Sequence, residues 1–504
     1  MTDTTTEMRD APAPPVRFGQ QERRGSFLGL TGTQVWVLSG LTLVCLLSLF
    51  VLQIWAWPVW LVSVLAAVVT VWRFRGEPVV SMVATQLGFA RRKLTGQHTY
   101  ARDVWETPWA PALHAPVNRA GREVTALGTV KMPGALGDME LFDVDHAGGF
   151  VFDRRSKRVA VTLAVQSRSW QLQDPDAQTA AVEGFMAWLN GLEHITGMVG
   201  ATIRIRADRS SSTELADFVD EFGDPGASEA LKTEYALLIE DGAGRAFAFS
   251  SSLTVTFALE NLTRQIKDAG GGLPGVAHVL EERVSALTEN AAAMGVRVKA
   301  WLNGAELQRE VTAAWDPVAA ARHRAEGHTL LEAAPVMGIE EGWSWIRADE
   351  TVHRVFWIAE WPRKKANTGF LEPLLMSGSS SRTVVLQIIP AASHKALKEA
   401  AKTLTDMELA AELQEKMGMR VSRKQEREHQ DVELRENDLV DGHAQARFRG
   451  FLVASAASME DLSRGASDIE TASHRALLVI QTLHAQQAAA FARTMLPIPM
   501  TEKE

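Results

Sequence analysis

The sequence has a single cysteine, Cys45, so no disulfide can form within one chain. This fits a reducing compartment such as the cytoplasm. Basic residues are also in deficit, with a net charge of -9 and a sequence pI of about 5.9. A nucleic-acid-binding domain normally has an excess of Lys and Arg. We therefore expect no direct binding of DNA or RNA.

The sequence lacks a phosphate-binding loop. The pattern G-x-x-x-x-G-K-[ST] is absent, and the dipeptide Gly-Lys does not occur at all. Such a loop needs its glycines between a strand and a helix, followed by the lysine and a hydroxyl residue. Gly242-Ala243-Gly244 lies between an expected helix and an expected strand, the reverse of the dinucleotide-binding order. It is typical of a turn, and we expect no nucleotide cofactor.

Metal and nucleophile motifs are missing too. The thirteen histidines are scattered, with no H-E-x-x-H and no Cys/His cluster at zinc spacing. No G-x-S-x-G nucleophile elbow occurs around Gly378. We therefore predict no catalytic residue, no cofactor, no metal and no enzymatic activity. A single sequence does not show which acidic residues converge, so an enzyme whose site no motif reveals stays an alternative.

A long run near the N-terminus lacks charge altogether. The 38 residues from Val35 to Trp72 include no Asp, Glu, Lys, Arg or His. One helical crossing of a bilayer needs about 20 apolar residues, so we predict a transmembrane hairpin over residues 33–75, after a disordered leader over residues 1–32. Pro58 suits the first turn of the second helix. Tryptophans near the expected helix ends would form an interfacial belt: Trp36, Trp55, Trp57, Trp60 and Trp72.

Basic residues flank this run on both sides. Arg23 and Arg24 precede it, Arg73 and Arg75 follow it, and the turn has none. The positive-inside rule then places both termini and the bulk of the chain in the cytoplasm, as a multi-pass protein of the bacterial inner membrane. One long buried helix is the alternative.

Residues 76–122 form a connector in which Ser81 to Leu94 is an expected helix. Its end, Arg91-Arg92-Lys93, either touches anionic lipid headgroups or is a solvated helix end. The first folded lobe, residues 123–320, alternates strand and helix periodicity. Its expected strands are Val159–Gln166, Val199–Arg206, Phe247–Leu259 and Val296–Trp301.

A similar order returns in the second lobe, residues 321–504. Its expected strands are Val352–Trp361, Thr383–Ile389, Ala446–Ser455 and Ala476–Ile480, with a long charged helical hairpin from Ser393 to Asn437. Both lobes follow the order strand, helix, strand, helix pair, strand, helix, strand, helix. We therefore predict an α+β fold of two related lobes that mix sheet and helices.

Aromatic and basic residues gather in the second lobe. Trp361 closes an apolar strand, and Arg363 follows within a basic run. Aromatic and arginine anchors dominate many interfaces, so both are candidate partner contacts. Burial of the strand residues in their own core is the alternative.

The layout resembles bacterial type IV secretion and conjugation machinery, as found in actinobacterial conjugation-like gene clusters. The hairpin with its basic flank resembles the PrgI-like membrane subunit, and the body resembles the N-terminal domain of the large secretion ATPase. The segments that carry the second likeness are VHRVFWIAEWPR, the helical hairpin after LQIIP, and HAQQAAAFARTMLPIP. In that ATPase the last segment leads into the motor domain. Here seven residues follow Leu496-Pro497.

The resemblance implies a non-catalytic inner-membrane scaffold or adaptor that holds a separate motor ATPase. Its further partners would be the lipid bilayer and other membrane subunits of the apparatus. The chain would belong to an oligomer within that complex. The residues nearest the expected contact are Met495, Leu496 and Ile498. Packing of this tail on its own lobe is the alternative. Two alternative functions are a structural membrane subunit of another export system, such as type VII secretion, and a membrane-tethered enzyme with no recognisable motif.

Overall fold

The computed structural model describes most of the folded body and several helices outside it. The described residues are 32–52, 57–71, 73–74, 77–101, 124–129, 139–144, 147–167, 173–209, 219, 223–224, 226–242, 247–317, 320, 336–362, 369–376, 378–391, 397–398, 401–405, 407–409, 411, 429, 432–433 and 445–501.

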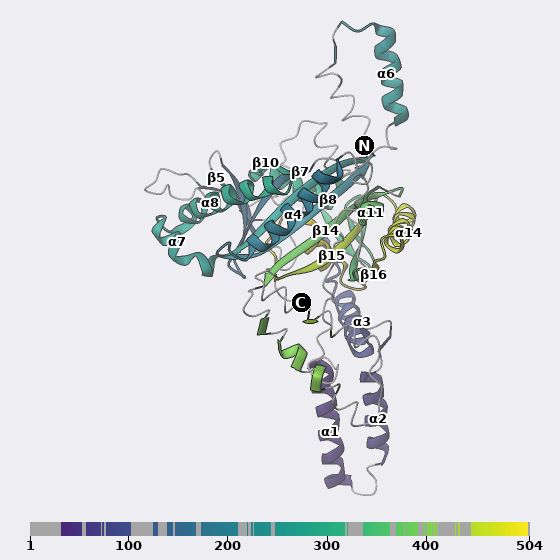
Figure 1. Ribbon diagram of the computed structural model, residues 1–504. Helices are drawn as coiled ribbons and strands as arrows, with labels where there is room; N and C mark the ends of the chain where they lie inside the picture. Colours follow the sequence, from purple (N-terminus) through teal and green to yellow (C-terminus); the bar gives the residue numbers. More distant parts are fainter. Residues whose placement is uncertain are drawn as a thin grey trace, which may run out of the picture.

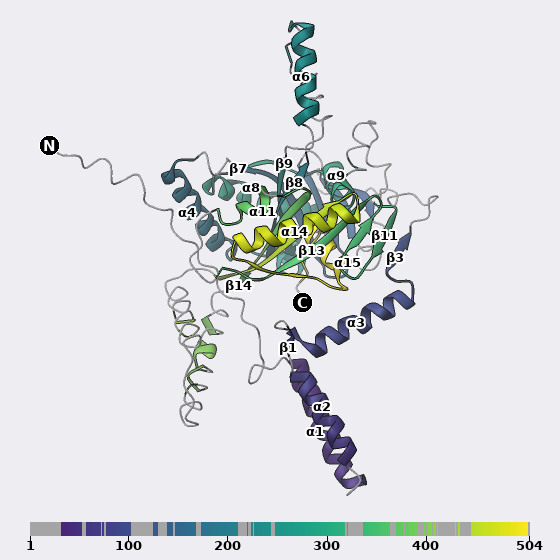
Figure 2. The same cartoon turned by 90° about the vertical axis from the view of Figure 1, so that its right-hand side faces the viewer.

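The charge-free run forms two helices that lie side by side and point away from the body (Figures 1 and 2). They are α1 (Gly32–Leu52) and α2 (Trp57–Val71). The indole Nε1 of Trp60 donates to Ser48 Oγ across the pair at 3.2 Å. The two helices therefore form a helical hairpin, as the sequence predicts.

Within the described residues, however, no helix combines the length and the apolar character that a membrane crossing requires. The predicted transmembrane hairpin is therefore wrong. So is the predicted location, a multi-pass protein of the inner membrane with both termini in the cytoplasm. The prediction counted one continuous charge-free run. The helices divide that run, leaving α2 only 15 residues, against about 20 for a crossing.

A third helix, α3 (Val79–Leu94), connects this hairpin to the body. The two-residue strands β1 (Arg73–Phe74) and β2 (Glu77–Pro78) precede it, and β3 (Thr99–Ala101) follows. Strand β3 pairs with β11 at one edge of the large sheet. Phe89 of α3 packs edge-on against Trp343, with ring centroids 5.5 Å apart. This contact and β3 fix α3 to the body by one face.

Among the described residues, the body is built on one 14-stranded sheet whose neighbouring strands pair antiparallel. Its first-lobe strands are β4 (Val124–Thr129), β5 (Met139–Val144), β6 (Gly148–Asp153), β7 (Arg158–Ser167), β8 (Met198–Arg209), β9 (Phe247–Ala258) and β10 (Val296–Trp301). Its second-lobe strands are β11 (Gly338–Glu341), β12 (Ile346–Ala348), β13 (Thr351–Glu360), β14 (Ser381–Ala391), β15 (Gln445–Ala456) and β16 (Val479–Thr482).

Each lobe contains the same β-α-β-β-α-β motif. In the first, β7, β8, β9 and β10 lie in the order β10-β7-β9-β8, and in the second, β13, β14, β15 and β16 lie in the order β16-β13-β15-β14. This is the arrangement of a ferredoxin-like unit. The helices of the two motifs are α4 (Pro175–Leu192) and α8 (Gly272–Ala293), then α11 (Glu372–Met376) and α14 (Met459–Arg475).

The two motifs join through their equivalent edge strands. Strands β8 and β14 pair antiparallel, with Arg382 opposite Ala207 and Ile388 opposite Ala201. Antiparallel pairing of equivalent strands is what an approximate two-fold axis between the motifs produces. The lobes therefore form one continuous sheet rather than two separate domains (Figure 1).

The sheet has a core on each face. On one face α4 and α8 cover the first lobe around Phe257 and Leu280, and α14 covers the second around Phe356 and Leu462. On the other face lie α9 (Gly304–Trp315) and α15 (Gln487–Met495), one from each lobe. The two helices meet at the joint between the lobes, where the ring centroids of Trp315 on α9 and Phe491 on α15 are 4.7 Å apart.

The predicted α+β class is confirmed, and most predicted strands lie within two residues of the observed ones. Strands β4, β5 and β6, between residues 124 and 153, were not expected, nor were the short strands β3, β11 and β12. Most of the predicted helical hairpin Ser393–Asn437, and the leader 1–31, lie outside the described residues.

Candidate functional site

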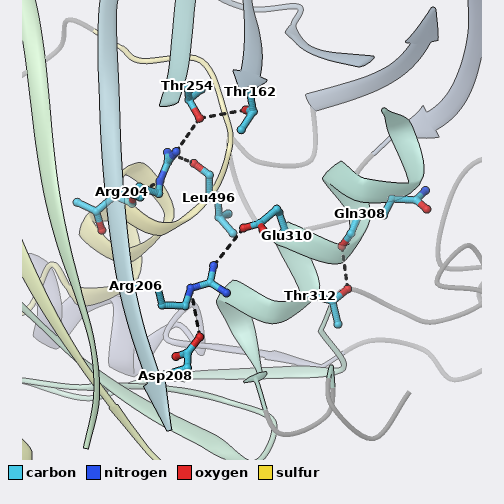
Figure 3. A network of polar contacts seen from close by, with 10 residues as sticks. Thr162, Arg204, Arg206, Asp208, Thr254, Gln308, Glu310, Thr312 and Leu496 are labelled. Atoms are coloured by element: carbon cyan, nitrogen blue, oxygen red, sulfur yellow. Dashed lines mark hydrogen bonds and ion pairs between the residues drawn. The ribbon is translucent and has the colours of Figure 1, made fainter. Parts of the chain in front are cut away.

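A buried polar network occupies the joint between the lobes (Figure 3). At its centre is Arg204 on β8, of which 5 % is exposed. Its Nε donates to the Thr494 carbonyl at 2.6 Å, its Nη2 donates to the Leu496 carbonyl, and its Nη1 donates to Thr254 Oγ1 at 2.6 Å. Thr254 Oγ1 is in turn 3.0 Å from Thr162 Oγ1. One guanidinium thus ties the C-terminal segment to β8 and β9.

Arg204 remains a cation in this setting. Burial lowers the pKa of its guanidinium to about 9, with nearby Glu310 acting in the opposite direction and Arg206 in the same direction. That value still lies above neutral pH. A buried charge is costly unless its donors are satisfied, and here all three side-chain nitrogens have an acceptor. Hydrogen bonds from a charged donor are about twice as strong as neutral ones.

A second arginine links the same strand to α9. Arg206 Nη2 lies 3.2 Å from Glu310 Oε2, and its Nε lies 3.8 Å from Asp208 Oδ2. Helix α9 starts with a capping box, in which Asn303 Oδ1 accepts from the Glu306 amide and the Glu306 carboxylate accepts from the Asn303 amide. The cap fixes where α9 begins and so where Glu310 lies.

The chain from α15 onward is tied to strands of both lobes. Gln387 Nε2 on β14 donates to the Arg493 carbonyl at 3.1 Å. Arg158 Nη1 on β7 donates to the Met500 carbonyl at 2.7 Å, and the Met500 amide donates to Thr256 Oγ1 at 2.9 Å. We call residues 494–500, held in this way, the clasp segment. It crosses the β8–β14 joint and holds the two motifs together.

A histidine is buried beside this region. His353 on β13 has Nε2 2.8 Å from the Trp315 carbonyl and Nδ1 2.8 Å from Ser455 Oγ. Burial lowers its pKa to about 4, against opposing effects of the Trp315 carbonyl and Asp316. The imidazole is therefore neutral near pH 7, with its proton on Nε2 because a carbonyl only accepts. It joins β13, β15 and the end of α9.

These groups position the chain rather than offer a reaction centre. Arg204 and His353 are both buried, and their polar atoms bond to other parts of the same protein. Among the described residues, no three or more His, Cys, Asp or Glu side chains lie where they could hold a metal ion.

The predicted partner contacts in the tail lie in the clasp segment and at its start. Met495 and Leu496 are buried in the core between α9 and α15, and Ile498 is half-buried against it. Trp361 is buried in the second-lobe core. Met495, Leu496 and Trp361 thus face the protein's own interior, and Ile498 is only partly accessible. Arg363 lies outside the described residues.

Some of the predicted interfacial tryptophans are exposed on helices, and the others lie outside the described residues. Trp36, Trp57 and Trp60 are exposed on α1 and α2, by 82 %, 65 % and 44 %. Trp55 and Trp72 lie outside the described residues, as do the orientation residues Arg23, Arg24 and Arg75. Arg73 begins β1.

Sequence reasoning missed two exposed surfaces. Helix α6 (Glu229–Gly242) projects from the side of the body opposite α3 (Figures 1 and 2), and its large apolar side chains are exposed. Helix α3 also exposes apolar side chains next to its basic end. The sequence predicted both helices, α3 by its residue range and α6 as the expected helix before Gly242. Their apolar residues at spacings of three and four were a signal, but that signal is the same for a helix buried on its own core.

No protein-family model and no curated protein matches this chain.

Proposed function

We propose that this chain is a non-catalytic scaffold subunit of a type IV secretion-like transfer apparatus, and that it holds a separate motor ATPase. The proposal begins from the resemblance of three segments to the N-terminal domain of the secretion ATPase. It makes no use of a membrane-spanning hairpin.

The observation that carries the proposal is the convergence of VHRVFWIAEWPR and HAQQAAAFARTMLPIP with the LQIIP strand, which precedes the predicted helical hairpin. Residues 352–360 of VHRVFWIAEWPR lie in β13, LQIIP lies in β14, and residues 487–499 of HAQQAAAFARTMLPIP span α15 and most of the clasp segment. Gln487 on α15 accepts from the Val355 amide at 2.8 Å and donates to the Val355 carbonyl at 3.2 Å, while Gln387 binds Arg493. Segments separated by more than a hundred residues thus build one core, which supports a resemblance of architecture.

The shape of the body supports a scaffold. Two equivalent motifs share one sheet, and the clasp segment ties their joint. A continuous sheet with a core on both faces makes a rigid platform. Helices α1, α2 and α6 project from it with exposed apolar side chains (Figure 2). Exposed apolar patches of this kind mark interaction sites.

A genetic test addresses the function directly. We expect deletion of the gene to abolish transfer of the element that encodes the apparatus, and the wild-type gene supplied in trans to restore it. The level of the neighbouring ATPase should stay unchanged in the deletion strain, which separates a missing subunit from a missing motor. Normal transfer frequency without this chain would rule the proposal out.

A further inference from the structure

Helix α6 carries an apolar seam that nothing in the described part of the chain covers. Leu231, Tyr235 and Leu238 follow at spacings of four and three and are 57 %, 51 % and 64 % exposed. This is the spacing by which helices pair along a coiled-coil seam. The side chains at residues 228–238 are exposed or nearly so, because the helix projects into solvent.

Helix α3 carries a second seam of the same kind. Val83, Leu87, Ala90 and Leu94 follow at spacings of four, three and four, and all four are exposed. The opposite face of α3 is the one that holds the body. There Phe89 packs on Trp343, while Arg92 lies 3.5 Å from Glu341 and donates to the Ala485 carbonyl. The seam therefore faces away from its own sheet.

The two helices are complementary in charge and length. Helix α6 contains four acidic residues and one basic residue, a net charge of -3, whereas α3 contains three basic residues and no acidic one, a net charge of +3. Glu234 flanks the α6 seam, and Arg91 and Lys93 flank the α3 seam, each exposed. These are the positions whose charges select partners in helix pairs. With 14 and 16 residues, the helices are about 21 and 24 Å long at about 1.5 Å per residue.

The sheet lies between the two helices, with α6 on one side of the body and α3 on the opposite side (Figures 1 and 2). They cannot meet within one copy. We infer that α6 of one copy of this chain packs on α3 of a second copy, apolar seam against apolar seam. Because the two surfaces differ, the contact is head to tail, and repetition gives a ring or an open filament. The inference goes beyond the scaffold function and does not rest on it.

Charge-exchange variants of the purified full-length chain test the pairing. Sedimentation velocity over a range of concentrations measures the dissociation constant of self-association. Glu234→Lys should weaken it by at least about tenfold, because it would place a lysine against a basic flank of α3 in the next copy, formed by Arg91 on one side of the seam or Lys93 on the other. The matched control is Thr233→Lys, which adds the same charge on the neighbouring position turned away from the seam, and should change the constant less than about threefold.

The triple variant Glu234→Lys, Arg91→Glu, Lys93→Glu should restore association to near the wild-type constant. All three positions are exposed, so the fold is expected to tolerate them, and circular dichroism checks this. A chain that stays monomeric at all concentrations would overturn the inference. So would association that Glu234→Lys leaves unchanged, or that the triple variant fails to restore. The assay contains no ATPase, so its outcome is separate from that of the scaffold proposal.

Discussion

Arg204 on β8 donates through Nε to the backbone carbonyl of Thr494 at 2.6 Å, although 290 residues separate the two in sequence. The same guanidinium also reaches Leu496 and Thr254. Burying a charge is costly unless its hydrogen-bonding groups are satisfied, and here each guanidinium nitrogen has an acceptor. Arg204 thereby joins the C-terminal clasp segment to the strand at which the two lobes meet.

Replacing Arg204 by Met keeps much of its volume and removes its three donors. We expect the free energy of unfolding to fall by about 3 kcal/mol, since two carbonyls and a threonine hydroxyl lose a charged donor inside the protein. Urea denaturation followed by circular dichroism measures this. Arg154→Met is the control, because the Arg154 side chain is 72 % exposed and its pair with Glu140 lies at the surface. Equal stability of the two variants would refute the clasp.

Stability should depend on pH through His353. Unfolded, a histidine binds a proton near its ordinary pKa of 6.5, whereas folded His353 does so only near 4. Its stabilising contribution is therefore complete above about pH 6.5 and is lost as the pH falls toward 4. Between pH 7.5 and pH 5 the free energy of unfolding should drop by about 2 kcal/mol from this group.

The control for that pH effect is His353→Gln, which cannot titrate. Asp316 and Arg206 also influence the pKa of His353. Burial raises the pKa of Asp349, so this carboxyl changes the stability at acidic pH in the opposite direction. The difference between wild type and variant removes these shared contributions. If both proteins lose the same stability between pH 7.5 and pH 5, His353 is not the cause.

Substitution of Gly200 measures how closely the clasp segment and the second lobe approach β8. A Cβ added there would lie 2.8 Å from the Ile388 carbonyl oxygen on β14 and 2.9 Å from Met500 Sδ in the clasp segment. Gly200→Ala should therefore cost about 1–3 kcal/mol of stability. At Gly191 in α4 a Cβ would meet nothing within 4 Å, so Gly191→Ala should stabilise by up to about 1 kcal/mol. Thermal melts that rank the two variants in the reverse order would contradict the joint described above.

The chain should neither bind nor hydrolyse ATP. The sequence lacks the glycine loop and the lysine with which a phosphate-binding loop holds nucleotide phosphates. We expect no shift in melting temperature of the purified full-length protein at millimolar ATP and magnesium, relative to magnesium alone. A nucleotide-dependent shift, or phosphate release above a heat-denatured control, would reveal an active site of this chain.

The sequence was sufficient for the local elements but not for how they combine. Period-two patterns located β7, β8 and β13, and the repeated order of elements anticipated the two equivalent motifs. Arg204 and Arg206 alternate with Ile203 and Ile205 in β8, which predicts a solvent-facing side for the arginines. That side is instead covered by α9, α15 and the clasp segment. Nothing local signals this, because it depends on pairing β8 with β14, about 180 residues later.

For the charge-free run, the sequence predicted the helices but not their ends. Composition predicted two helices and they are present, but composition did not define where each helix stops. The apolar tail was likewise a candidate contact until burial of Met495 and Leu496 placed it inside the protein. An apolar residue alone does not distinguish an exposed docking surface from a core; its exposure does.

The most direct test of the scaffold proposal is capture between the purified full-length chain and the motor ATPase that the proposal requires. The full chain is required, because removal of the clasp segment would take away the acceptors of Arg204. We expect the two proteins to elute together in size-exclusion chromatography at micromolar concentration. Capture should persist when the lysine of the ATPase phosphate loop is replaced, since holding a motor needs no hydrolysis. Separate elution of the two folded proteins would contradict the account.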